Sequence, residues 1–464
     1  MPRRLPAGFL REERSSDDDR WLPPPRRDCS IEPLIDACAA YEAMEQALIE
    51  ATASIWLAHW SLDTDFATQS RAARDAHLPD WTSLLTDAVE RGLEVRVIFN
   101  DFDPLVGYGW HLETWQAYRH LMKAAGEAAS ANAAFDRARF QVIVSMHDAR
   151  LELPLIGIAA NFQIDEAVDD LNGWTTANNI ESARQAFEFL PRLWRYVAFD
   201  PGASIPFSRA RSAAQDPVHV GSHHQKLCII DRRVAFLGGI DIGGVLVSNG
   251  RHEAAPYRHD VHFRVTGAVV ADLVRAFRGR WNREGRAALD FVRDANAVAP
   301  AAPLPISRYS AIAKDVPPVF RTGRAIAQMI RTVTGPIAQP PAPEAVRLDT
   351  EACVMRALQA AEKFVYIEHQ YLRWPVLADW LIDARSKSPE LRVIVLVPFV
   401  LEEAGDPADT DPVTLHGMHL QHQTLKRLSD AFGPQAGLFT LGARVRYEDP
   451  PRVLKSCRSI VEAA

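Results

Sequence analysis

Cysteine is scarce in this sequence, with five residues among 464. Their number is odd and their spacing is wide, which argues against a disulfide framework and against closely spaced zinc ligands. A reducing compartment is therefore the simpler interpretation. The five positions are Cys29, Cys38, Cys228, Cys353 and Cys457.

Long hydrophobic runs are also missing. The longest, VIVLVPFVL at residues 393–401, falls far short of the roughly 18 apolar residues that cross a bilayer. The N-terminus begins with arginines but holds no apolar segment of the kind that a secretory signal needs. We therefore expect a cytoplasmic protein by default, with secretion by another route left open. Any reaction on a lipid would take place at a membrane surface.

The sequence lacks an excess of positive charge. It has 52 Lys and Arg against 59 Asp and Glu, a formal net charge of −7 at pH 7. No global positive field is available to hold a nucleic-acid backbone, so we expect no nucleic-acid partner. An anionic ligand would have to be bound by local groups.

Residues 1–37 are charged and rich in proline, a composition that buries too little apolar surface to offset ordering entropy. We expect a disordered or loosely packed tail there. From Tyr41 onward, helical apolar spacing alternates with short apolar runs, which favours an α/β layered fold. The expected strands are 54–60, 93–99, 225–230, 234–238, 364–369 and 391–397.

One order of elements occurs twice. YEAMEQALIEATA, SIWLAHWSL, WTSLLTDAVERG and LEVRVIF read as helix, strand, helix and strand, and so do EACVMRALQAAEK, FVYIEHQYL, PVLADWLIDARSKSP and LRVIVLVPF. The two series align without gaps on His59 and His369, which predicts two related lobes, over 38–297 and 346–464, joined by a Pro-rich linker over 298–345. The alternative is chance, because any α/β protein repeats such patterns.

One motif carries chemistry. Among fifteen histidines, only His224 is followed by a lysine two positions later, and Asp231 lies five residues beyond Lys226 in the string HQKLCIID. Residues i and i+2 of a strand share a face, so the imidazole and the ammonium could contact one phosphate. Gly238 and Gly239 end the next strand, where missing side chains would let backbone amides approach an anion.

These residue types suit phosphoryl transfer through a covalent intermediate. A neutral imidazole attacks phosphorus, an ammonium neutralises charge on the non-bridging oxygens, and a carboxylate orients the site. Such a set requires no metal and no cofactor. Each residue alone has an ordinary structural explanation, but the three at this spacing before a Gly-Gly pair are harder to obtain by accident.

The string HHQKLCIIDRRVAFLGGIDI resembles the first catalytic motif of the phospholipase D superfamily. RHDVHFRVTGAVVADLVRAFRGRWN resembles the strand and helix that follow that motif, and FVYIEHQYL resembles the strand that opens the second lobe. The resemblance covers roughly residues 40 to 450. It implies two similar α/β/α-sandwich lobes, and hydrolysis or alcohol exchange at a phosphodiester through a phosphohistidine.

The resemblance also implies roles for particular residues. His224 would be the nucleophile, Lys226 a phosphate ligand and Asp231 the orienting partner. Gly239 and Asp241 would shape the substrate pocket. In the second lobe, Glu368 and His369 would lie near that pocket.

The second lobe departs from the family pattern. The family normally has two such motifs in one site, because one histidine attacks while the other protonates the leaving alcohol. No histidine of the second lobe is followed by a lysine two positions later, and the last residues, LKSCRSIVEAA, resemble at most a degraded motif. Two interpretations stay open: an incomplete, truncated or frame-shifted C-terminal lobe, or a homodimer that shares two single motifs across a two-fold interface.

The sequence thus predicts a phospholipase D-type phosphodiesterase. Its expected substrate is a phospholipid headgroup ester at a membrane surface, with water or an alcohol as acceptor. One alternative is a binding or vestigial protein that keeps one phosphate half-site. The others are a cardiolipin-synthase-like transferase and a nuclease, and the negative net charge disfavours the nuclease.

Overall fold

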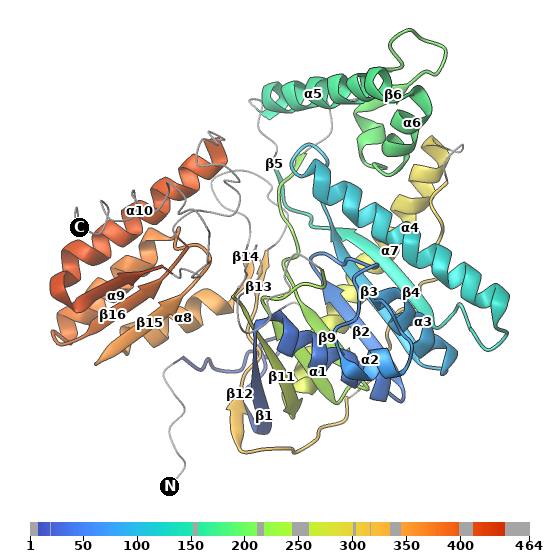
Figure 1. The fold of residues 1–464 in the computed structure, drawn as a ribbon. Coiled ribbons are helices and arrows are strands. Elements are labelled where there is room, and N and C mark those ends of the chain that lie inside the picture. Colours follow the sequence, from blue (N-terminus) through green and yellow to red (C-terminus); the bar gives the residue numbers. More distant parts are fainter. Residues whose placement is uncertain are drawn as a thin grey trace, which may run out of the picture. The chain divides into compact units, whose positions relative to one another are not determined.

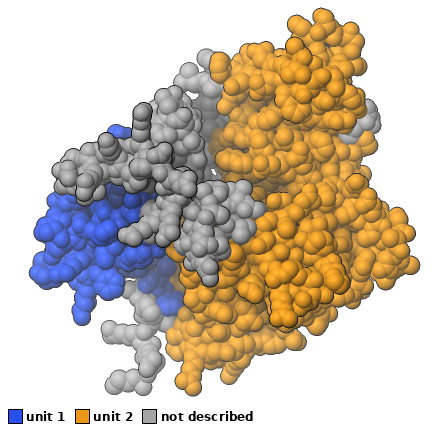
Figure 2. Space-filling model, viewed as in Figure 1, with its two compact units in different colours: residues 1–9, 350–464 blue, residues 10–349 orange. Residues whose placement is uncertain are grey.

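The computed structural model describes residues 8–18, 20–151, 156–210, 218–243, 259–299, 303–315, 317–334, 345–398 and 412–440. The chain divides into two compact units (Figure 2). The larger unit spans residues 10–349, and the smaller unit combines residues 350–464 with residues 1–9. Within the described ranges, no helix has the length and apolar character needed to cross a membrane.

An eight-stranded mixed sheet forms the centre of the larger unit, in the order β12-β1-β11-β10-β9-β2-β3-β4 (Figure 1). Strands β2, β3 and β4 run parallel, whereas β9, β10, β11, β1 and β12 are joined by antiparallel pairs. The pair β2·β9 is antiparallel, so the parallel and antiparallel halves meet there. The strands are β1 (Arg26–Ile35), β2 (Ser54–His59), β3 (Glu94–Asp101), β4 (Phe140–Met146), β9 (Leu227–Ile230), β10 (Val234–Gly238), β11 (Val261–Gly267) and β12 (Ala325–Ala327).

Helices cover both faces of this sheet, as alternation along β2 shows. Ile55 and Leu57 enter one core with residues of α1, α3 and α4, while Trp56 enters a second core with Phe277 and Trp281 of α7. Both faces of the strand are therefore buried, which confirms the predicted α/β architecture. The helices are α1 (Asp36–Glu50), α2 (Arg71–Asp75), α3 (Trp81–Glu90), α4 (Tyr108–Ala131), α5 (Ile156–Ala177), α6 (Ile180–Glu188), η1 (Leu193–Arg195) and α7 (Val270–Val298).

Short strand pairs complete the larger unit, outside its central sheet. Each pair is antiparallel and holds a connection between larger elements. They are β5 (Arg150–Leu151) with β8 (Val218–His219), β6 (Val197–Phe199) with β7 (Phe207–Arg209), and β13 (Thr332–Thr334) with β14 (Ala345–Leu348).

The expectation of a loose tail over residues 1–37 is wrong for Arg26–Ile35, which forms β1 between β11 and β12. Arg26 donates two hydrogen bonds of 2.8 Å to the carboxylate of Asp272 on α7. Cys29 and Leu34 are buried although most of their neighbours are polar. The segment is hydrophilic in composition, yet Arg26 pairs with Asp272 far along the chain. Composition alone does not reveal such a partner.

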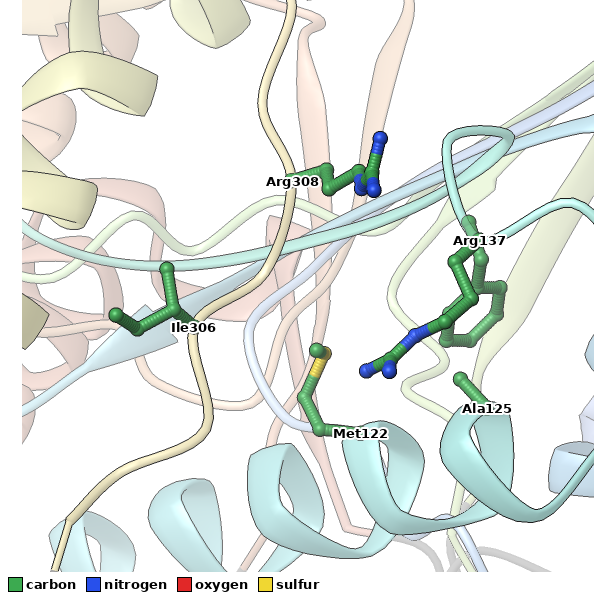
Figure 3. Close-up of a pocket in the computed structure, with 6 residues that line it drawn as sticks. Met122, Ala125, Arg137, Ile306 and Arg308 are labelled. Carbon is green, nitrogen blue, oxygen red and sulfur yellow. The ribbon is translucent and has the colours of Figure 1, made fainter. Parts of the chain in front are cut away.

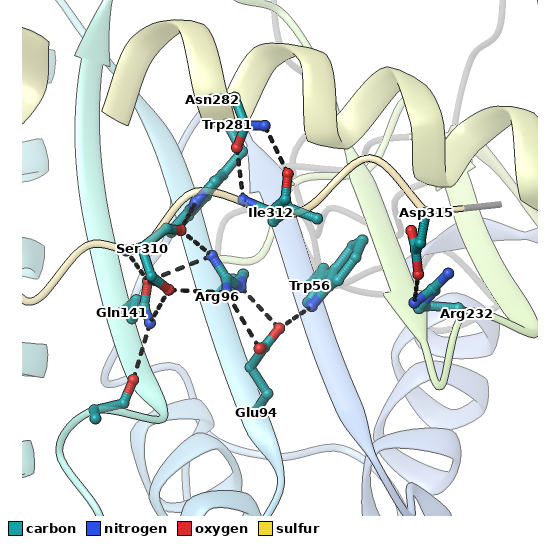
Figure 4. A network of polar contacts seen from close by, with 11 residues as sticks. Trp56, Glu94, Arg96, Gln141, Arg232, Trp281, Asn282, Ser310, Ile312 and Asp315 are labelled. Atoms are coloured by element: carbon teal, nitrogen blue, oxygen red, sulfur yellow. Dashed lines mark hydrogen bonds and ion pairs between the residues drawn. The ribbon is translucent and has the colours of Figure 1, made fainter. Parts of the chain in front are cut away.

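The expected linker over 298–345 also differs, because part of it packs on the larger unit. Ser310 accepts hydrogen bonds through its carbonyl oxygen from Arg96 (2.6 Å) and Trp281 (3.0 Å), and its amide donates to Gln141 (2.9 Å; Figure 4). Leu304 is buried in the core. Residues 303–315 form no helix or strand, but side chains of β3, β4 and α7 bind their backbone.

This packed segment borders a small pocket of about 180 Å³ against α4 (Figure 3). Met122 and Ala125 of α4 line one side of it, and the side chain of Arg137 extends into it (Figure 3). None of the residues predicted to carry chemistry lines it. The lining residues are Met122, Ala125, Arg137, Phe140, Ile306 and Arg308.

The smaller unit has a three-stranded parallel sheet in the order β15-β16-β17. Its core includes Leu381, Val393, Val395 and Phe432. The helix, strand, helix, strand order expected from the sequence occurs in both units, and β15·β16 is parallel like β2·β3. The elements are α8 (Asp349–Gln359), β15 (Phe364–Glu368), α9 (Pro375–Lys387), β16 (Arg392–Leu396), α10 (Pro412–Phe432), η3 (Gly433–Gln435) and β17 (Ala436–Phe439).

All six strands expected from the sequence are present, with ends within two residues of the predicted ones. The units differ on one side of their first parallel strand. In the larger unit β9 pairs with β2. In the described part of the smaller unit, β15 pairs with β16 alone.

Candidate active site

His224 and Lys226 lie together at the start of β9, where the sheet changes from antiparallel to parallel pairing. The Nζ atom of Lys226 is 3.2 Å from Nε2 of His224. The lysine side chain is buried, whereas the histidine is exposed. The structure thus brings the two residues into contact, with the imidazole accessible to a ligand.

A third residue, Asp241, holds the lysine. Its Oδ2 atom lies 2.7 Å from Nζ of Lys226, and its Oδ1 atom accepts hydrogen bonds from the amides of Trp60 (3.2 Å) and Ser61 (3.3 Å). Burial alone would raise the pKa of Asp241, but nearby His59 and the charge of Lys226 outweigh burial and lower it. Asp241 is therefore an anion that fixes the ammonium beside His224.

Aromatic rings form one side of this site. The ring of Trp60 lies edge-on to that of His224 at a centroid distance of 5.4 Å, and Nζ of Lys226 lies 5.3 Å from the Trp60 ring. Phe102 and Trp110 pack against Trp60 at 5.1 and 5.3 Å, and Trp110 remains 45% exposed. These rings give the site an apolar wall beside its charged groups.

The electrostatic surroundings favour a neutral imidazole at His224. Partial burial, then the positive charge of Lys226, lower the pKa of His224 from its ordinary value of 6.5, and Asp241 opposes them only in part. A lowered pKa leaves the imidazole unprotonated at neutral pH. The lone pair of Nε2, which accepts a hydrogen bond from Nζ of Lys226 in this structure, becomes available to attack phosphorus when a phosphate oxygen takes over that donor.

The structure corrects the role expected for Asp231, which lies in the turn after β9, at the other end of the strand from Lys226. At about 3.3 Å per residue, this strand separates the two by more than 10 Å. The carboxylate instead accepts hydrogen bonds from the amides of Thr52 (2.9 Å), Ala53 (2.7 Å) and Ser54 (2.9 Å). Asp231 ties the start of β2 to the β9–β10 hairpin, and Asp241 is the carboxylate that contacts the lysine.

We expect Asp231→Ala to lower the free energy of unfolding by about 2 kcal/mol or more, because three amides lose a charged acceptor. Burial would raise the pKa of Asp231, but the backbone hydrogen bonds from Ser54 and Thr52 outweigh it and lower the pKa. The stabilisation is therefore present above the unfolded-state pKa and is lost as pH falls through the folded-state pKa.

Urea unfolding of the wild type and Asp231→Ala at pH 7, and again at decreasing pH, measures this difference. Asp290→Ala is the control, because Asp290 is exposed and forms its ion pair with Arg293 at the protein surface. A difference between wild type and Asp231→Ala that stays constant as the solution is acidified would contradict the assigned role.

The Gly-Gly pair is required by close packing. A Cβ atom on Gly239 would lie 2.1 Å from Oδ1 of Asp260, and one on Gly238 would lie 2.4 Å from the carbonyl oxygen of Val261. The backbone of β10 therefore approaches β11 more closely than any side chain allows. A contact of Gly239 with substrate stays a prediction.

Gly239→Ala is expected to displace the Asp260 side chain and to destabilise the protein by about 1–3 kcal/mol, the usual cost of overpacking. Gly109→Ala is a matched control, because nothing lies within 4 Å of a Cβ atom added there. Thermal unfolding of both variants tests this. Equal midpoints of thermal unfolding for Gly239→Ala and the wild type would show that the Asp260 side chain moves aside without loss of stability.

A buried polar cluster that sequence reasoning missed supports the motif from α7. Arg280 donates to Oε1 of Gln225 at 2.8 Å and to Glu284 at 3.1 Å, and Nε2 of His223 lies 3.4 Å from Glu284. Burial would raise the pKa of Glu284, but Arg280 and His223 outweigh it and lower the pKa to about 2. The only sequence signal was an Arg and a Glu four residues apart on a helix that is otherwise half apolar.

Glu368 and His369, expected near the pocket, belong to the smaller unit. Both are exposed at the end of β15. Glu368 accepts a hydrogen bond from the hydroxyl of Tyr366 (2.8 Å), and the amide of His369 donates to the carbonyl of Leu396 (3.1 Å). Their contact with substrate stays a prediction.

Comparison with known proteins adds one sequence relative and several structures. No family model matches the chain. Phospholipase D alpha 2 of Arabidopsis thaliana is 24% identical over 235 residues, which cover 38% of this chain and 27% of that relative's length.

Two solved structures are similar to the chain at low identity. Nuc from Salmonella typhimurium, described as a phospholipase D family member, is 10% identical over 55% of this chain and 96% of its own, with a TM-score of 0.28. Phosphatidylserine synthase from Haemophilus influenzae is 12% identical over 89% and 73%, with a TM-score of 0.43. In its sequence match and in the residues gathered at His224, the chain is similar to members of the phospholipase D superfamily.

Proposed function

We propose that this chain is a phospholipase D-type phosphodiesterase that cleaves the headgroup ester of a phospholipid through a phosphohistidine. The observation that carries the proposal is the neutral, accessible imidazole of His224 beside a lysine that Asp241 fixes as an ammonium. A nucleophile and a cation at this separation can act on the same phosphate group.

The reaction has two displacements. Nε2 of His224 forms a bond to phosphorus as the bond from phosphorus to the headgroup oxygen breaks, and the departing alkoxide takes up a proton. Lys226 neutralises the charge that grows on the non-bridging oxygens. Water or an alcohol then attacks the phosphohistidine, loses a proton, and releases the free imidazole with phosphatidic acid or a new phosphodiester.

Three features support a lipid over a nucleic-acid substrate. The net charge is −7, which disfavours a polyanion. The site is walled by Trp60, Phe102 and partly exposed Trp110, which suits an amphiphile at an interface. The matched Arabidopsis thaliana relative is named as a phospholipase.

The test is headgroup release from phosphatidylcholine vesicles, with plasmid DNA as the competing substrate. Rapid acid-free quenching with a ³²P-labelled lipid should leave label on His224, located by peptide mass spectrometry. Faster cleavage of DNA than of lipid would show that the chain is a nuclease and not a phospholipase.

A binding protein without turnover is the second candidate, favoured by the single HxK string in this sequence. It predicts that inorganic tungstate, a phosphate mimic, binds the wild type and not Lys226→Met, while no ester is cleaved. Measured turnover that depends on His224 excludes it.

A further inference from the structure

Two buried histidines lie behind the proposed catalytic residues and are not used by the mechanism above. His59 is 1% exposed and His262 is fully buried. Within the described part of the chain, neither ring nitrogen of either residue has a hydrogen-bond partner at normal distance. Burying such a group costs about 1–3 kcal/mol, so an apolar residue would be the better choice if packing were its only role.

The position of His59 suggests what it does. It is the last residue of β2, and its Nδ1 atom lies 3.6 Å from Oδ1 of Asp241. The same oxygen accepts the amides of Trp60 and Ser61, the next two residues of the chain. Three consecutive residues therefore surround one carboxylate oxygen, while the other oxygen contacts Lys226 at 2.7 Å.

We propose that His59 is a positioning residue, which holds Asp241 in the orientation that keeps Lys226 beside His224. The two amides lie at the long end of hydrogen bonding, so they alone hold the carboxylate weakly. An N–H at Nδ1 of His59 is a third donor, close enough to form a hydrogen bond after a shift of a few tenths of an ångström. Asp241 is buried, so water does not replace a lost donor.

The second buried histidine, His262, lies beside β10. It packs where Gly238 has no side chain, since a Cβ atom there would lie 2.8 Å from Nδ1 of His262. Burial, then the charges of His59 and Lys226, lower the pKa of His262 to about 3, so it stays neutral at physiological pH. A neutral His262 does not compete with Lys226 for the charge of Asp241.

The test uses three substitutions at His59. His59→Asn places an amide nitrogen near the position of Nδ1, whereas His59→Gln places it near Nε2 and His59→Leu removes it. The first readout is acetylation of Lys226 by a water-soluble ester, followed by mass spectrometry. Lys123, whose side chain is 76% exposed against 3% for Lys226, is the internal reference.

We expect Lys226 to be acetylated about tenfold faster, relative to Lys123, in His59→Leu and His59→Gln than in the wild type. In His59→Asn the ratio should stay within about twofold of the wild type, because the donor is kept. Near-UV circular dichroism of each variant shows whether the core is intact. An unchanged ratio in folded His59→Leu, or no rescue by folded His59→Asn, would overturn the proposal.

The second readout rests on the proposed function. If the chain is a phosphodiesterase, His59→Leu should lower kcat about tenfold with KM within about twofold, and His59→Asn should restore most of it. A wild type without turnover would remove the proposed function while the acetylation ratios still decide the role of His59. Active enzyme with unchanged ratios would remove only the positioning role.

Discussion

His224→Asn is expected to lower kcat for a phospholipid ester by at least about 10³-fold, because loss of a nucleophile removes the covalent step itself. Asparagine keeps the polarity and much of the size of histidine but offers no lone pair of comparable nucleophilicity. Headgroup release from vesicles and the yield of labelled protein measure the loss. His77→Asn is the matched control, since His77 is exposed and its backbone φ of 58° suits asparagine.

The pH dependence of the wild type gives a second measure of the same residue. Partial burial and Lys226 lower the pKa of His224, so the imidazole stays unprotonated as pH falls through its ordinary value of 6.5. We expect the acid limb of kcat/KM to lie below pH 6.5 and to be lost in the asparagine variant. Full activity of His224→Asn, or an acid limb above 6.5, would contradict the nucleophile assignment.

The second large effect concerns the leaving group. General acid catalysis contributes about 10²–10⁴ in rate, and the sequence offers no second HxK histidine to supply it. We therefore expect the chain as a monomer to hydrolyse phosphatidylcholine by about that factor more slowly than a two-motif relative. A p-nitrophenyl ester needs little protonation of its leaving group and should lose far less.

Both substrates are compared while the protein concentration is varied across the range in which light scattering reports the oligomeric state. Rapid hydrolysis of phosphatidylcholine by a demonstrated monomer would show that the monomer does not lack a general acid. Activity that rises with the dimer fraction would instead support a site built from two copies of the His224 motif.

The sequence located the reacting pair because their contact is local. Two-residue periodicity puts His224 and Lys226 on one face, and the structure shows Nζ 3.2 Å from the ring. The carboxylate was assigned wrongly because distance along the chain is not distance in space. Asp231 follows Lys226 closely yet lies at the far end of β9, whereas β10 pairs back along β9 and returns Asp241 to the lysine.

The segment Arg26–Ile35 escaped prediction for a related reason. Its charged residues look like a solvated tail until their partners are known, and Asp272, which binds Arg26, comes from a helix far along the sequence. The role of His59 was equally hidden, because a histidine on a buried strand has the same local pattern whether or not a carboxylate lies beside it. In all three cases a residue has a partner that is distant in the sequence, and a local pattern does not reveal that partner.

The order of strands in the central sheet also sets when the larger unit can fold during synthesis. Strand β2 is made early, but its partner β9 ends at Ile230, and β1 is enclosed only when β12 emerges near Ala327. Until then the ribosome holds a chain with unpaired apolar strand edges, the kind that associates between molecules. A chaperone that covers these edges should therefore raise the yield of folded protein, whereas slower translation by itself lengthens their exposure.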